Sequence, residues 1–66
     1  MEDEILTKEQ VAAILKVTTR AVGRLTAGRQ IPFLRGLGRE YRYLKSSIIA
    51  WLKERETKPE NAYIEP

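Results

Sequence analysis

Two arginines one helical turn apart, Arg20 and Arg24, are the residues of this sequence best suited to recognise a ligand. At about 100° per residue they share one face of a helix with the small residues Gly23 and Ala27, and the opposite face is apolar. An arginine fork can donate two hydrogen bonds to the edge of a guanine, and small neighbours let a helix enter a groove. The pattern predicts a helix that reads bases in the major groove of DNA.

Catalytic and metal-binding chemistry has little to build on here. The 66 residues include no histidine and no cysteine, which excludes zinc-finger ligation, disulfide bonds and the commonest catalytic base. Tyr41 or Tyr43 could act as a recombinase nucleophile only beside a positioned base and a substrate cleft, which so short a chain hardly supplies. No cofactor or metal is expected, and an enzyme is the least favoured class.

Positive charge is concentrated in the middle of the chain. Residues 16–45 hold eight basic residues against one acid, a net charge of +7, whereas the flanks hold four basic and eight acidic residues, a net charge of −4. A basic surface with acidic ends fits binding to a polyanion. The plainer explanation is a solvated charged surface, but most of the basic residues lie in the segments predicted to face DNA.

A first helix that would support the reading helix is expected to begin at Lys8. Thr7 and Gln10 have the types and spacing of a capping box, in which each side chain accepts a hydrogen bond from the other residue's backbone N–H. The apolar residues Val11, Ile14 and Leu15 share a narrow sector of this helix, so we expect them to pack on the core.

The second helix is expected over residues 19–27, after a tight turn through Lys16 and Val17, with Thr18 as its cap and Gly28 ending it in a left-handed conformation. This is the spacing of a helix-turn-helix. Gly23 is costly inside a helix, and either close packing against the first helix or close approach to DNA would explain it. The candidate DNA contacts of this helix are Thr18, Thr19, Arg20, Gly23, Arg24 and Ala27.

Two short aromatic and branched runs, residues 31–35 and 40–43, flank a glycine-rich turn and predict a β-hairpin. We call residues 31–43 the wing. Its candidate DNA contacts, to phosphates or the minor groove, are Arg35, Gly38 and Arg39, whereas Arg42 is expected to cover the core.

A third helix is expected to follow with Ser46 as its cap and to end at Arg55. Ile48, Trp51 and Leu52 recur at helical spacing, which makes Trp51 a core residue, the largest, rather than a platform for stacking bases. Ile49 lies off this stripe and is expected to be partly exposed. Residues 56–66 are polar and predict a mobile tail, whose apolar Tyr63 and Ile64 would fold back on the domain or dock on a partner.

Residues 5–52 resemble the excisionase family of winged helix-turn-helix proteins, compact MerR-like domains that include AlpA-like regulators. The resemblance is carried, in order, by ILTKEQVAAIL, KVTTRAVGRL, IP, GREYRY and SSIIAWL. Gly23 departs from it, because a larger and often aromatic residue is common there, and Gly28 comes one residue early. The resemblance implies a mainly α fold with a small β-hairpin, in which residues 1–55 form three short helices plus the wing and residues 56–66 a flexible tail.

The family resemblance implies a non-enzymatic protein that binds and bends double-stranded DNA and steers an integrase or recombinase toward excision. The alternatives are a small AlpA-like transcriptional regulator of a phage or mobile element and, in another class, a protein-interaction adaptor. RNA binding is less favoured because the tyrosines lie in the wing rather than on a sheet face. The chain is expected to be cytoplasmic, bacterial or phage-encoded and nucleoid-associated, without a membrane segment. It is expected to be a monomer in solution, because no heptad segment follows the third helix, and the resemblance implies side-by-side contact between neighbours on DNA.

Overall fold

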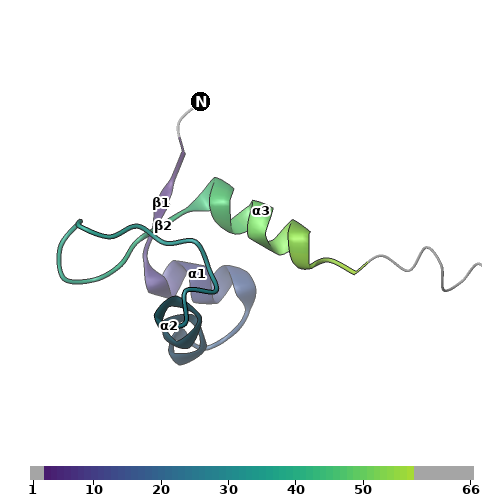
Figure 1. Cartoon of the computed structure of the whole chain (residues 1–66), viewed down its shortest axis with the longest axis horizontal. Coiled ribbons are helices and arrows are strands. Elements are labelled where there is room, and N and C mark those ends of the chain that lie inside the picture. The colour runs from purple at the N-terminus through teal and green to yellow at the C-terminus, as the bar shows by residue number, and fades with distance from the viewer. Residues whose placement is uncertain (1–2, 58–66) are drawn as a thin grey trace, which may run out of the picture.

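The computed structural model describes residues 3–57, which form two short strands and three helices. In chain order these are β1 (Ile5–Leu6), α1 (Lys8–Leu15), α2 (Thr19–Ala27), β2 (Tyr43–Leu44) and α3 (Lys45–Arg55). Figure 1 shows α1 and α2 beside each other below the strands, α3 to the right of the strands, and the loop between α2 and β2 extending to the left, away from α3. The predicted mainly α class with three helices is confirmed.

Two predictions concern the C-terminal part of the chain, namely the end of the third helix and the tail that follows it. The third helix ends at Arg55 as predicted, but most of the expected mobile tail, with Tyr63 and Ile64, lies outside the described residues. Within residues 3–57, no helix combines the length and apolar character needed to cross a membrane.

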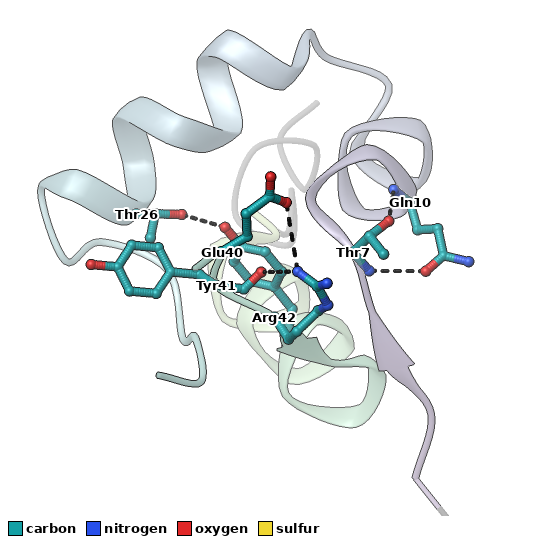
Figure 2. A network of polar contacts seen from close by, with 7 residues as sticks. Thr7, Gln10, Thr26, Glu40, Tyr41 and Arg42 are labelled. Carbon is teal, nitrogen blue, oxygen red and sulfur yellow. Dashed lines mark hydrogen bonds and ion pairs between the residues drawn. The ribbon is translucent and has the colours of Figure 1, made fainter. Parts of the chain in front are cut away.

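The beginning of α1 is set by the predicted capping box. Thr7 Oγ1 accepts the Gln10 N–H at 3.2 Å, and Gln10 Oε1 accepts the Thr7 N–H at 2.9 Å, as Figure 2 shows. Val11 is fully buried, but the prediction for Ile14 is wrong, since 40% of it is exposed. Ala12 is buried in place of Ile14, so the side of α1 that faces the core is centred on Val11 and Ala12.

The predicted wing hairpin is wrong in its extent. Its two runs share a single antiparallel bridge between Leu34 and Arg42, with N···O distances of 2.7 and 3.3 Å. Tyr43–Leu44 pairs instead with Ile5–Leu6, and the buried Leu6 and Tyr43 lie opposite each other. This pairing places the side chains of Leu6 and Tyr43 in the core. The wing is therefore a loop fixed at its base by one bridge and by β2.

The core is built from every element. It consists of Leu6, Val11, Ala12, Val22, Ile31, Tyr43 and Ile48, with Leu15, Leu25, Phe33 and Trp51 packed against it. The largest fully buried side chain is Tyr43, so the prediction that Trp51 would be the largest core residue is wrong. Trp51 lies at the edge of the core, where its indole N–H donates to the Gln30 carbonyl at 2.7 Å and the Arg55 guanidinium lies 4.3 Å from its ring centroid.

The first turn of α3 is capped from the N-terminal segment and not by Ser46. Helix α3 begins at Lys45, and Ser46, in its first turn, donates both its N–H and its hydroxyl to the Asp3 carboxylate. The Ser46 hydroxyl, and then its backbone N–H, lower the pKa of Asp3 below its usual value. A lowered pKa means that the charged carboxylate makes this contact, which weakens as the pH falls through the folded-state pKa. On the outer face of α3, Ile49 is 42% exposed, as predicted, and Leu52, predicted to be in the core, is 37% exposed.

Helix α2 ends in a left-handed residue, but that residue is Arg29 and not the predicted Gly28. Gly28 has φ −85°, whereas Arg29 has φ 56°. The Gln30 N–H donates to the Leu25 carbonyl at 2.8 Å, which closes the last turn one residue later than the glycine suggested. A non-glycine residue is thus held in a strained conformation because the hydrogen bonds and the buried Ile31 fix the chain beyond it.

Candidate nucleic-acid interface

The turn between α1 and α2 is tight and is held by backbone hydrogen bonds. Lys16 adopts φ 59°, and the Val17 N–H donates to the Ala12 carbonyl at 3.0 Å. Thr18 Oγ1 accepts the Ala21 N–H at 3.1 Å and so begins α2, as predicted. These local contacts fix the direction in which α2 leaves α1, and they give the pair a helix-turn-helix geometry.

Helix α2 presents two distinct faces, as its sequence predicted. Val22 and Thr26 are buried, and Leu25 packs against the core. Gly23 is half-buried, and the remaining candidate contacts of this helix, Thr18, Thr19, Arg20, Arg24 and Ala27, are all exposed. The exposed face is therefore basic and carries no large apolar side chain.

A buried pair of hydroxyl groups, which was not predicted from the sequence, joins α2 to β2. Thr26 Oγ1 donates to the Val22 carbonyl at 2.9 Å and lies 2.7 Å from the Tyr43 hydroxyl (Figure 2). Since the threonine hydroxyl has one proton and gives it to Val22, the tyrosine donates to the threonine. The spacing of Val22 and Thr26 along the helix was the signal that Thr26 faces inward. The bond sets the distance between α2 and the end of the wing.

The tip of the wing depends on two glycines with positive φ, Gly36 at 83° and Gly38 at 121°. This is a backbone conformation that other residues adopt rarely. Arg35 and Arg39, on either side of these glycines, are exposed. Arg42 is half-buried, lies 3.7 Å from a Glu40 carboxylate oxygen and donates to the Tyr41 carbonyl (Figure 2).

A cleft of about 320 Å³ separates α2 from the wing. It brings together three of the predicted contacts, Gly23, Ala27 and Arg39, whereas the other six lie outside its lining. The other five lining residues were not predicted as contacts, and they include Lys8 and Tyr41. The full lining is Lys8, Gly23, Thr26, Ala27, Arg39, Glu40, Tyr41 and Tyr43.

Close packing does not explain Gly23. A Cβ built on this residue would lie 3.9 Å from Lys8 Nζ, and no atom of the α1 backbone comes within 4 Å of it. Of the two explanations offered by the sequence, the packing of helices against each other is therefore excluded.

The charges of the exposed face are largely unmatched. Across residues 3–57 the ion pairs are Arg42 with Glu40 and Lys45 with Glu4, at 3.7 and 3.6 Å. Neither pair includes Arg20, Arg24 or Arg39, so these guanidinium groups are free to bind an anion or a base edge.

Comparison with known proteins agrees with this geometry. The sequence model of a protein family, described as a helix-turn-helix domain, matches residues 5–56. This range includes both strands and all three helices described above. No curated protein and no solved structure matches the chain. The matched family is typical of small excisionase-like and AlpA-like DNA-binding proteins, as the sequence resemblance implied. This chain therefore belongs to the helix-turn-helix domain family.

Proposed function

We propose that this protein recognises a specific double-stranded DNA site by placing α2 in the major groove and the wing against the neighbouring backbone or minor groove. The family itself supports sequence-specific DNA binding. The observation that supports our placement is the exposed face of α2, where Arg20 and Arg24 have no ion-pair partner within residues 3–57 and have small residues beside them. Such a face can approach base edges without a steric barrier.

Different residues have different roles in this proposal. Arg24 reads a base, with Arg20 in support, while Gly23 and Ala27 allow the helix to come close. Thr18 uses its oxygen as an acceptor for the helix cap, which leaves its hydroxyl proton free to donate to a phosphate. Thr19 lies beside it and has an exposed side chain.

The wing positions the protein on the DNA backbone. Arg39 contacts a phosphate or enters the minor groove, Arg35 assists it, and the Gly38 backbone allows the tip to lie close to the DNA. These contacts contribute affinity and orientation rather than base identity.

The biological role that we propose is that of an excision factor of a phage or mobile element, which binds and bends DNA and directs an integrase. It rests on the likeness to excisionase-like proteins. A small transcriptional regulator would use the same contacts. An altered excision frequency in a recombination assay supports the first role, and a promoter response without an integrase supports the second.

An adaptor that uses the fold only to bind proteins is the alternative from another class. The unpaired arginines do not favour it, because such a surface has no need of an exposed basic face. Catalysis by Tyr43 is also disfavoured, since its hydroxyl is buried and bonded to Thr26.

The test is binding of the intact chain to DNA fragments from its own locus and to scrambled duplexes over a series of salt concentrations. We expect the logarithm of the association constant to fall linearly with the logarithm of the salt concentration, and one fragment to bind at least about a thousandfold more tightly than scrambled DNA. Affinity that is independent of salt, or absent for every fragment, would leave the adaptor as the better account.

A further inference from the structure

Gly23 leaves open a space that a lysine from another helix enters. Lys8 is the first residue of α1, and its Nζ lies 3.9 Å from the position that a Cβ of residue 23 would take. No other atom outside α2 within the described chain comes as close to that position. The ammonium group of Lys8 therefore lies beside Gly23, the one residue without a side chain on the face of α2 that is proposed to contact DNA.

Lys8 and Arg39 line the same cleft from different elements, α1 and the wing. The cleft also has a carboxylate in its lining, that of Glu40, which is 68% exposed and lies 3.7 Å from Arg42. Because Glu40 has Arg42 as a counter-charge, the two cations at the cleft are not neutralised by it. An anion in the cleft would thus have positive charge on two sides.

Groove geometry identifies the anion. A strand of the sugar-phosphate backbone separates the major groove from the minor groove. If α2 lies in the major groove and the wing reaches the adjacent backbone or minor groove, that strand must pass between them, which is where the cleft lies. A cleft of about 320 Å³ has room for a phosphate with part of its sugar.

We propose that Lys8 and Arg39 hold one DNA backbone phosphate between them in this cleft, and that residue 23 must be small because a longer side chain would displace the ammonium group of Lys8. The proposal rests on the function proposed above and adds a residue outside the second helix and the wing. It also gives Gly23 a role, which is to leave room for the positively charged Lys8 ammonium beside α2.

The experiment measures DNA affinity over a salt series for Lys8→Met, Gly23→Leu and the double variant. Loss of one phosphate contact should lower the salt slope of Lys8→Met by about one and weaken cognate and scrambled DNA alike, roughly five- to tenfold at 0.1 M salt. Gly23→Leu should lower the salt slope by a similar amount, because its side chain displaces the ammonium, and the double variant should show no lower slope than either single one.

Two control variants isolate the effect. Lys53→Met removes the same charge from the exposed last turn of α3, away from the cleft, and should leave affinity and slope unchanged. Gly23→Ala should keep wild-type binding, because a methyl group 3.9 Å from Lys8 Nζ makes an ordinary contact.

Each other result overturns a defined part of the account. If Lys8→Met binds as the wild type does while Arg24→Ala loses discrimination, the phosphate site is wrong and the proposed function stands. If the wild type shows no salt-dependent DNA affinity, the proposed function is wrong and the phosphate site with it. If Gly23→Leu lowers the salt slope further in the Lys8→Met background, Gly23 acts on the charge contacts independently of Lys8 and its assigned role is wrong.

Discussion

Replacing Tyr43 by alanine is expected to unfold the domain. Tyr43 is the largest fully buried side chain, 1% exposed, and its hydroxyl donates to Thr26 on α2. Truncation of a buried aromatic residue costs about 3–5 kcal/mol, and a domain of this size has a total stability of only about 3–10 kcal/mol. Circular dichroism during thermal and urea unfolding should show a largely unfolded chain or a greatly lowered midpoint.

The neighbouring tyrosine provides a matched control. Tyr41 is 45% exposed and contacts Phe33 edge-to-face, with ring centroids 4.8 Å apart, so Tyr41→Ala should reduce stability by no more than about 1.5 kcal/mol. Tyr43→Phe keeps the ring and removes the hydrogen bond, at a cost of about 1 kcal/mol. Equal losses for Tyr41→Ala and Tyr43→Ala would contradict the core described above.

Replacing Arg24 by alanine is expected to reduce the preference for the cognate site by about five- to 150-fold. An arginine that forks onto a guanine contributes about 1–3 kcal/mol of discrimination, so cognate affinity should fall about five- to 150-fold. Affinity for scrambled DNA should change little beyond the loss of one charge. Titration of both duplexes with the wild type and the variant measures the ratio directly.

Arg39→Ala is the comparison for this result, because it removes the same type of side chain from the wing. A phosphate contact carries no base identity, so cognate and scrambled DNA should weaken alike, and the salt slope should fall by about one. If Arg39 enters a narrow minor groove instead, the loss should increase with the A·T content of the wing site. Equal losses on both duplexes for Arg24→Ala would exclude α2 as the element that reads bases.

The features that could be predicted from the sequence are those fixed by neighbouring residues. Thr7 with Gln10 and Thr18 with Ala21 interact across three residues, so the beginnings of α1 and α2 could be predicted from residue types alone. The two faces of α2 follow from helical periodicity in the same way.

The features that could not be predicted depend on residues far apart in the chain. Ser46 is hydrogen-bonded to Asp3, 43 residues away in the chain. Capping preferences consider only residues near the helix end, so they assigned the cap of α3 to Ser46 instead of Asp3. Tyr43, predicted to lie in the wing hairpin, pairs instead with Leu6 of β1 and is buried in the core. The position of the Lys8 ammonium beside Gly23 likewise depends on how α1 packs on α2, and this packing could not be predicted from the sequence.

The central claim is that α2 reads bases in the major groove, and methylation interference tests it most directly. Dimethyl sulfate modifies guanine N7 in the major groove and adenine N3 in the minor groove, and the N7 atom is one that Arg24 would contact. We expect N7 methylation at one or a few guanines of the cognate site to block binding by the wild type, and the same methylation to have little further effect on Arg24→Ala. Binding by the wild type that is insensitive to N7 methylation at every guanine of the site would contradict the claim.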